Sequence, residues 1–450
     1  MKERFFKVIG GPLNERGYSI ATSFEEIETN NKRTPSTIYI LGMLPFEEGI
    51  VKTFKTKREI FYTHIVELTK RSKDRVNQVD TESYLASSPL QILSFNAEQR
   101  LKQEFLEGLY SNSLSSSNIK SSEIKIITNN KEYGYRNKVE FGFYEDYDEY
   151  NLYLSFFKRE GNSGKYILED GTSIADPRIN ELGLRIVKIL KEFNISGKEL
   201  KTLLIRSSSV EVKARLYVTN NEILFENPEL KAKFADLPIS VVFSDKKSPA
   251  SITDSFLLNS NDVMTETIDN MKFHFAIDGF FQVNIPVFES MIKDVKEYIN
   301  TNINSHKPSI NLLDLYSGVG VIGMLLSMMF KHVKGVDMSQ ESKDFSELNT
   351  KLNNISNYTY VQSEAEKIVE LINPNEVLFL DPPRIGCHLK VIEKIIETKP
   401  EHIFYLSCNP ITQARDFELL KEIYNIEFIR GYNFYPKTPH LESLIILMRK

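Results

Sequence analysis

The last third of the chain alternates short apolar runs with amphipathic segments, and this alternation is the feature that most narrows its possible folds. From about residue 278 the predicted elements are helix 285–299, strand 311–316, helix 319–330, strand 332–337, helix 340–352, strand 376–381, helix 390–398 and strands 402–407, 426–432 and 443–447. Buried strands separated by helices are typical of a parallel sheet with helices on both faces. We therefore predict a doubly wound, Rossmann-like α/β domain with an antiparallel edge over residues 278–450.

The residues before this domain show two other patterns. Residues 1–75 hold short alternating runs at 36–40, 49–54 and 60–66, which predict strands of a small OB-like β-barrel. Residues 76–277 combine further strands with a helix at 97–110 and another at 180–193, which is an α+β pattern. The predicted order is barrel, central α+β domain and catalytic domain.

Charge and cysteine content limit the possible partners and compartments. The formal net charge of −5 gives no overall attraction to nucleic acid, so an RNA site would have to be a local basic patch. Such a patch, or only a solvated surface, is offered by the barrel residues Lys52, Lys55, Lys57, Arg58, Lys70, Arg71, Lys73 and Arg75. Two cysteines cannot build a disulfide scaffold, and no apolar run approaches the length of about 18 residues that spans a bilayer. We expect a cytoplasmic protein with no membrane segment.

A glycine turn follows the strand at 311–316. Residues 318–323, Gly-Val-Gly-Val-Ile-Gly, match G-x-G-x-x-G, and Asp337 ends the next strand. Glycines allow the backbone to approach a ligand, and a carboxylate at a strand end can bind ribose hydroxyls. The turn would serve NAD or S-adenosylmethionine equally, or could be purely structural.

Two other strand ends carry reactive groups. Asp381 ends one strand before two prolines, and Cys408 ends the next before the helix-disfavouring pair 409–410. A thiolate can add to an electrophilic carbon, and Glu442, in a proline-braced loop before the last strand, could act as its partner base or lie on the surface. The second cysteine, Cys387, is interpreted as a packing residue.

Taken together, six segments resemble the RNA 5-methyluridine methyltransferases, a class I family that uses S-adenosylmethionine on tRNA or ribosomal RNA. They occur in the family's order over about 300 residues: Tyr135-Arg136-Asn137-Lys138, Phe280-Phe281-Gln282-Val283-Asn284, Leu313-Asp314-Leu315-Tyr316-Ser317-Gly318-Val319-Gly320, Asp381-Pro382-Pro383-Arg384, Ser407-Cys408-Asn409-Pro410 and Thr438-Pro439-His440-Leu441-Glu442. The N-terminal barrel is similar to the TRAM domain that many members carry.

This resemblance implies a role for each matching residue. Cys408 would be the nucleophile and Glu442 the proton acceptor. The expected contacts of S-adenosylmethionine are Gln282, Tyr316, Gly318, Gly320, Asp337 and Asp381. The expected RNA contacts are Arg136, Asn137, Lys138 and Phe281. The segment at about 93–120 would pack on the catalytic domain.

The sequence departs from the family pattern in two places. Many members hold an iron–sulfur cluster, but serine and alanine stand at 86–88 and no cysteine lies near 170–172, so no cluster and no other metal is expected. Val321 stands where some relatives place a polar cofactor contact.

Three other functions stay open. An RNA 5-methylcytidine methyltransferase would share the fold but would carry a second catalytic cysteine where Arg384 stands. A nicotinamide-dependent oxidoreductase would use the glycine turn and leave Cys408 idle. A non-catalytic RNA-binding or RNA-folding protein would need only the barrel and the central domain. The sequence does not name the RNA, for which the barrel weakly favours ribosomal RNA, and a monomer is the default expectation.

Overall fold

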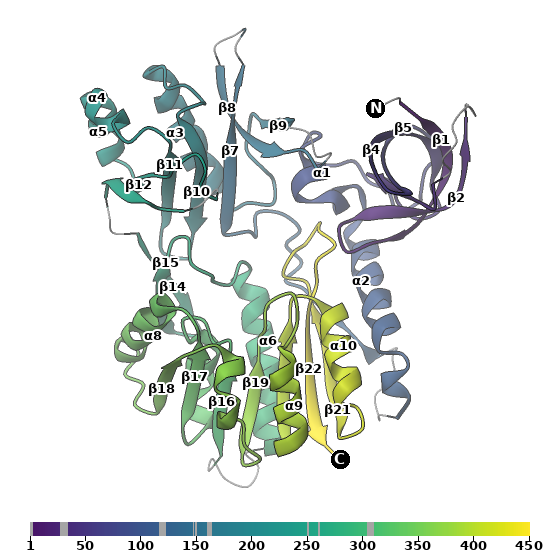
Figure 1. Cartoon of the computed structure of the whole chain (residues 1–450), viewed down its shortest axis with the longest axis vertical. Coiled ribbons are helices and arrows are strands. Elements are labelled where there is room, and N and C mark those ends of the chain that lie inside the picture. Colours follow the sequence, from purple (N-terminus) through teal and green to yellow (C-terminus); the bar gives the residue numbers. More distant parts are fainter. Residues whose placement is uncertain are drawn as a thin grey trace.

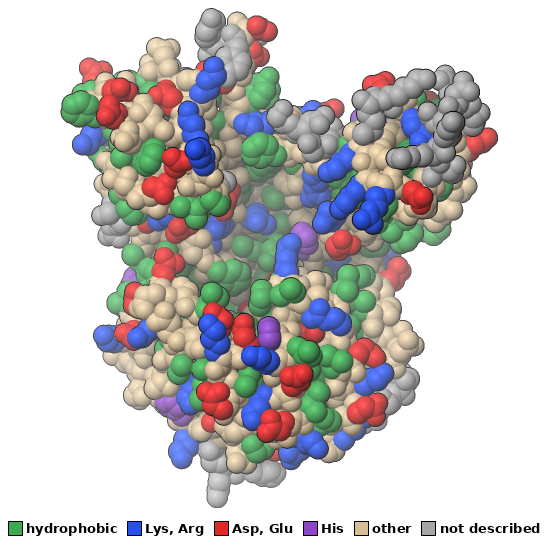
Figure 2. All heavy atoms as spheres, in the orientation of Figure 1, with side chains coloured by type: hydrophobic (Ala, Val, Ile, Leu, Met, Phe, Trp, Pro, Cys, Tyr) green, Lys and Arg blue, Asp and Glu red, His purple; other side chains and the backbone are tan. Residues whose placement is uncertain are grey.

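The computed structural model describes residues 3–27, 35–116, 123–146, 148, 151–159, 164–249, 252–259, 262–303 and 310–450. The elements form three bodies around a central hollow: an N-terminal barrel, a central sheet and a C-terminal sheet (Figure 1). The space-filling view shows the hollow between the three bodies, with basic side chains on the wall that the barrel contributes (Figure 2). In the described parts of the chain, no helix is both long and apolar enough to cross a bilayer.

The N-terminal body is the predicted small closed barrel. Its strands are β1 (Phe5–Leu13), β2 (Tyr18–Glu26), β3 (Thr37–Leu41), β4 (Glu48–Lys57) and β5 (Ile60–Lys70). They close in the order β1-β2-β3-β5-β4, in which only the β3–β5 pairing is parallel. Alternate side chains such as Phe6, Ile38, Val51 and Phe61 fill the interior. The first two strands were not among the predicted elements.

A connecting segment then runs from the barrel onto the C-terminal sheet. It contains α1 (Tyr84–Ser87), a 3₁₀ turn (Pro89–Ile92) and α2 (Phe95–Tyr110), followed by the short strand β6 (Ile126–Ile127). Leu106 and Tyr110 of α2 share a buried cluster with Phe417 and Leu420. The Tyr110 hydroxyl donates to Gln413 Oε1 at 2.9 Å. Residues 117–120, the end of the segment predicted to pack on the catalytic domain, lie outside the described residues.

The central body is one seven-stranded sheet with helices against one face. The strand order is β13-β12-β11-β10-β7-β8-β9. The strands are β7 (Lys138–Asp146), β8 (Asn151–Phe157), β9 (Lys165–Leu168), β10 (Leu200–Ser207), β11 (Val212–Val218), β12 (Ile239–Phe243) and β13 (Ser255–Leu258). The helices are α3 (Pro177–Glu192), α4 (Ile223–Glu226) and α5 (Pro228–Ala235), which share the sheet's apolar core. A two-stranded ribbon, β14 (Val263–Ile268) and β15 (Met271–Ala276), leads to the C-terminal body.

The C-terminal body is the predicted doubly wound sheet, in the order β18-β17-β16-β19-β20-β22-β21-β6. Its strands are β16 (Asn311–Leu315), β17 (Val333–Asp337), β18 (Tyr358–Gln362), β19 (Glu376–Leu380), β20 (His402–Ser407), β21 (Tyr424–Tyr432) and β22 (Glu442–Arg449). Its helices are α6 (Ile285–Tyr298), α7 (Val321–Leu326), α8 (Gln340–Leu352), α9 (Leu389–Thr398) and α10 (Pro410–Leu420). Adjacent strands from β18 to β20 are parallel.

Three details of this sheet differ from the prediction. The antiparallel strand β22 lies between β20 and β21 rather than at an edge, and β6 pairs in parallel with β21 on its other side. Strand β18 was not predicted. The pair Asn409-Pro410 does not prevent a helix but starts α10, with Asn409 as the N-cap. Proline is well tolerated at the first helical position, where its missing N–H would have no intrahelical partner.

Candidate active site

The carboxyl ends of four parallel strands meet at one cavity of about 880 Å³. Tyr316 follows β16, Asp337 ends β17, Asp381 follows β19 and Cys408 follows β20. Gln282, Gly318 and Glu442 complete the set of predicted site residues that line this cavity. Residues from six separate chain segments therefore converge where ligands bind in open α/β sheets.

The glycine turn contributes one open position and one packed position. Gly318 has φ +53°, and a Cβ built there would meet nothing within 4 Å, so a ligand can approach its backbone. Its N–H donates to Asp337 Oδ2 at 3.1 Å. Gly320 has φ +86° and does not line the cavity; a Cβ there would lie 2.7 Å from the Tyr358 hydroxyl. Gly320 is needed for packing, and the structure does not place it against a ligand.

The charge of this cavity selects among cofactors. Its wall carries the acids Asp337, Glu341, Glu364, Glu366, Asp381 and Glu442. Arg384 is the basic residue among the lining side chains. Such a wall favours a cationic ligand and opposes a dinucleotide, whose pyrophosphate is anionic. S-adenosylmethionine carries a sulfonium and an ammonium group, so the residues fit it better than they fit a nicotinamide cofactor.

Three groups with strongly raised pKa values lie together in the cavity. Burial raises the pKa of Asp381 to about 7, and burial together with the Asp381 charge raises that of Glu442 to about 8. Burial and then the two carboxylates raise the pKa of the Cys408 thiol to about 12. Tyr435, from the loop before β22, donates from its hydroxyl to Glu442 Oε1 at 3.3 Å. Perturbed groups gathered in one cleft are typical of an active site.

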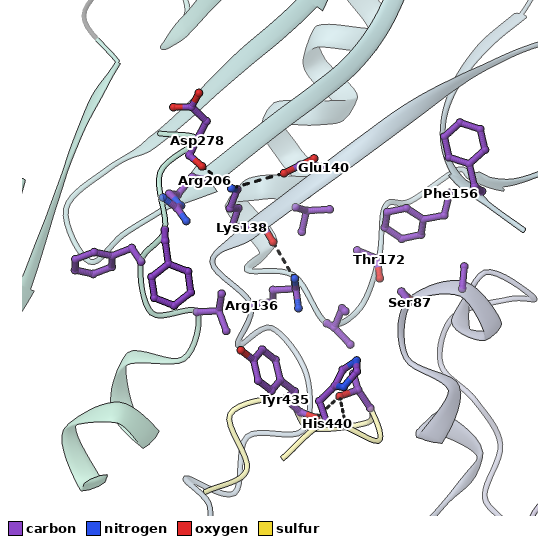
Figure 3. A pocket seen from close by; sticks show the side chains of 18 of the residues that line it. Ser87, Arg136, Lys138, Glu140, Phe156, Thr172, Arg206, Asp278, Tyr435 and His440 are labelled. Atoms are coloured by element: carbon purple, nitrogen blue, oxygen red, sulfur yellow. Dashed lines mark hydrogen bonds and ion pairs between the residues drawn. The ribbon is translucent and has the colours of Figure 1, made fainter. Parts of the chain in front are cut away.

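A second cavity, of about 710 Å³, lies beside the first and faces the central sheet (Figure 3). Arg136 and Lys138 line it, as predicted RNA contacts would. Asn137 does not line it; its Nδ2 donates to the Gln282 carbonyl at 2.9 Å and so supports the cofactor side. Phe281 does line this cavity, although it is largely buried.

The two aromatic residues of the pair 280–281 differ in exposure. The sequence predicted an RNA contact for Phe281. Phe281 is 3 % exposed and stacks on Phe275 with ring centroids 3.9 Å apart, so its side chain is part of the core. Phe280 is 75 % exposed and lines both cavities. Phe280 therefore presents the larger aromatic surface in the second cavity, and the RNA contact at Phe281 stays a prediction.

The second cavity has the opposite charge to the first. Its basic residues are Arg136, Lys138, Arg159, Arg206 and Arg384, against the acids Glu140 and Asp278. Arg206 was missed by the sequence analysis because it lies in the buried strand β10; it is 1 % exposed and its Nε has no partner. A basic cavity in an acidic chain fits a phosphate-bearing ligand.

The basic residues of the barrel are partly engaged within the barrel. Arg75 is held by Glu47 at 2.6 Å and by the Gly42 carbonyl, so it is a structural residue. Lys52 pairs with Glu3 and Lys70 with Glu48. Among the described residues, no group of three or more His, Cys, Asp or Glu side chains is arranged to hold a metal ion.

Comparison with known proteins agrees with this geometry. The family model described as tRNA (Uracil-5-)-methyltransferase matches residues 95–376 and 373–450. An uncharacterized RNA methyltransferase of Enterococcus faecalis is 27% identical over 443 residues, covering 92% of both chains. Another, from Clostridium tetani, is 31% identical over 71% of this chain and 73% of its own. The structure of Pyrococcus abyssi tRNA (uracil-54, C5)-methyltransferase in complex with S-adenosyl-L-homocysteine shares the fold, with 20% identity, a TM-score of 0.73 and coverage of 98% of this chain and 100% of that one. The chain belongs to the tRNA (uracil-5-)-methyltransferase family of S-adenosylmethionine-dependent RNA methyltransferases.

Proposed function

We propose that this protein methylates carbon 5 of a specific uridine in ribosomal RNA or tRNA through a covalent adduct with Cys408. The observation that carries the proposal is that Cys408, Asp381 and Glu442 line the same acidic cavity as Gln282, Tyr316 and Gly318. One cavity would thus hold the nucleophile Cys408, the base Glu442 and a cationic methyl donor.

The chemistry follows from the electronic structure of uracil. Carbon 5 is a weak nucleophile until the Cys408 thiolate adds to carbon 6 and produces an enolate. S-adenosylmethionine supplies the methyl group. Glu442 then accepts the proton from carbon 5, and elimination breaks the S–C6 bond and frees the thiolate. Because burial raises the pKa of Glu442 to about 8, this residue is a stronger base than an exposed carboxylate.

The target base must leave its stack to reach Cys408, at a cost of a few kcal/mol. The second cavity opens beside the catalytic one and shares Phe280, Arg384 and Tyr435 with it. Its cations can bind the phosphates next to the target, and the exposed Phe280 ring can stack on a base. We further propose that the protein acts as a monomer in the cytoplasm.

A trapping experiment tests the proposal. RNA containing 5-fluorouridine cannot lose fluorine as a proton, so incubation with the cofactor should leave a covalent protein–RNA complex, seen by denaturing electrophoresis and intact mass. The complex should disappear in Cys408→Ala. Glu442→Gln should accumulate a methylated adduct on ordinary uridine RNA, because the proton on carbon 5 stays in place. Sequencing the trapped RNA would identify the substrate.

The alternatives give different results in the same experiment. An adduct with 5-fluorocytidine RNA but not with 5-fluorouridine RNA would show a cytosine enzyme. No adduct with either, despite measured binding of the cofactor, would contradict the proposal. A non-catalytic RNA-binding protein would behave alike as wild type and as Cys408→Ala.

A further inference from the structure

Arg384 lines the cavities around Cys408, and the proposed mechanism assigns it no role in the reaction of the sulfur. A third cavity, of about 290 Å³, lies on the barrel side of Cys408, between the turn at 14–16 and helix α2. Cys408 lines this cavity and the acidic cavity. Arg384 is the residue common to the walls of all three cavities. Arg384 therefore shares with Cys408 the walls of both cavities that Cys408 lines.

The backbone fixes Arg384 in this place. The two prolines before it restrict the chain, and the Gly386 N–H closes a turn onto the Pro383 carbonyl at 2.8 Å. The Arg384 carbonyl accepts hydrogen bonds from Asn409 Nδ2 at 2.9 Å and Thr412 Oγ1 at 3.2 Å. Asn409 directly follows Cys408 and Thr412 lies in the first turn of α10, so the loop after β19 is tied to the segment that carries the nucleophile.

The other basic groups in the two cavities that Cys408 lines are either neutral or lie next to an acid. The ionisable residues of the two cavities that it lines are Glu15, Arg16, Lys102, Tyr316, Asp337, Glu341, Glu364, Glu366, Asp381, Arg384, Tyr435, His440 and Glu442. Burial, with nearby cations, lowers the pKa of His440 to about 4, so its ring is neutral at physiological pH. Lys102 is bound to Glu98 Oε1 at 2.8 Å and Asn433 Oδ1 at 2.7 Å. Arg16 lies 3.9 Å from Glu15.

Arg384 opposes the groups that keep the thiol protonated. Burial and the carboxylates of Glu442 and Asp381 raise the pKa of Cys408, whereas the charge and side-chain hydrogen bond of Arg384 lower it. A cation beside a cysteine favours the thiolate, which is the nucleophilic form. The Arg384 side chain is exposed in the free protein, so bound RNA would cover it and strengthen this interaction.

We propose that Arg384 is a catalytic residue whose guanidinium hydrogen-bonds the Cys408 sulfur and stabilises the attacking thiolate. The thiol proton leaves to water, and the sulfur keeps the electron pair that forms the S–C6 bond. The C5=C6 π electrons move into the enolate, and elimination later returns the pair to sulfur, again beside Arg384. This assignment rests on the proposed function for its chemical purpose.

The test needs neither RNA nor cofactor. The rate at which iodoacetamide alkylates Cys408 in the full-length protein is measured from about pH 6 to 10, with the modified cysteine identified by peptide mass spectrometry. In Arg384→Gln the rate near pH 8 should fall about tenfold, because below the thiol pKa the thiolate fraction falls tenfold for each unit by which that pKa rises. Arg384→Lys should restore part of the rate, because it keeps the charge. Arg100→Gln is the matched control, since Arg100 pairs with Asp74 near the surface, lines none of the three cavities and should leave the profile unchanged.

The outcomes separate this inference from the proposed function. Binding of S-adenosylhomocysteine and the melting temperature check that each variant is folded. A wild-type alkylation profile in Arg384→Gln would overturn the role of Arg384, even if turnover on RNA were lost. A shifted profile together with no 5-fluorouridine adduct in the wild type would leave Arg384 as a thiolate-stabilising residue and contradict uridine methylation.

Discussion

At the scale of single residues, the site depends on carboxyl groups that are costly to ionise. Asp381 and Glu442 lie in the same cavity, and burial raises their pKa values to about 7 and about 8. In the free protein near neutral pH, both are therefore protonated to a large extent. A positive charge placed in the cavity would lower both pKa values and release protons, because it favours the ionised forms.

The first prediction concerns these protons. Binding of S-adenosylmethionine at pH 7 should release on the order of one proton, whereas S-adenosylhomocysteine, which lacks the sulfonium charge, should release fewer. Titration calorimetry in buffers of low and high ionisation enthalpy measures the number. The number of protons released should be smaller near pH 9, because both carboxyls are already ionised there. It should also be smaller in Glu442→Gln. Equal release by the two ligands would contradict the charge argument.

At the scale of elements, α2 holds the loop that carries the base although it lies far away in sequence. Within α2, Glu98 and Lys102 form a buried ion pair with a 2.8 Å contact. Glu98 also accepts from the Lys437 N–H at 3.0 Å, and Lys102 donates to Asn433 and to the Tyr435 carbonyl. Because Tyr435 contacts Glu442, the helix positions the base through this loop.

The second prediction tests α2 as a positioning element. Lys102→Met should leave the Glu98 carboxylate buried and unpaired and lower the free energy of unfolding by about 3 kcal/mol, measured with denaturant. Turnover should fall more than cofactor affinity, while the 5-fluorouridine adduct should still form, since adduct formation does not need Glu442.

The control for this prediction lies on the same helix. Arg100 pairs with Asp74 at 3.1 Å near the surface, so Arg100→Met should cost less than about 1 kcal/mol. Equal stability losses for Lys102→Met and Arg100→Met, or loss of the adduct in a folded Lys102→Met protein, would contradict the positioning role.

At the scale of the whole molecule, Arg159 joins parts of the chain that surround the basic cavity. It follows β8 of the central sheet and donates to the Arg16 carbonyl of the barrel at 2.5 Å. It also donates to the Ala86 carbonyl of α1, at 3.2 Å from Nε and 3.0 Å from Nη2. One side chain thus connects the barrel and the central sheet.

The third prediction is that Arg159 supports RNA binding more than cofactor binding. Arg159→Gln should weaken RNA binding about tenfold at moderate salt and reduce the slope of log affinity against log salt by about one, as expected for one lost phosphate contact. S-adenosylhomocysteine binding should not change. Arg185→Gln, on the exposed side of α3, is the control with the same loss of charge. An unchanged salt slope in Arg159→Gln would show that Arg159 only joins the bodies.

The sequence by itself determined the C-terminal sheet and the convergence of its chemistry. Strands β16, β17, β19 and β20 are short apolar runs, and each leads into a glycine, a carboxylate or a thiol. Parallel strands have their carboxyl ends at the same edge, so a local pattern was enough to bring Asp337, Asp381 and Cys408 to one cavity. Three of the five barrel strands, β3, β4 and β5, were also predictable, because their side chains alternate between inside and outside.

Only the tertiary structure decided the orientation of residues without a periodic pattern. Phe280 and Phe281 are identical in the sequence, and the packing of Phe275 buries the second of them. The Gly320 backbone packs against the Tyr358 hydroxyl, and Arg206 reaches the basic cavity from a buried strand. For Gly320 and Arg206 the deciding contacts come from segments distant in the chain. Local sequence patterns report which face of an element is apolar, whereas contacts between distant segments exist only once the sheets have packed.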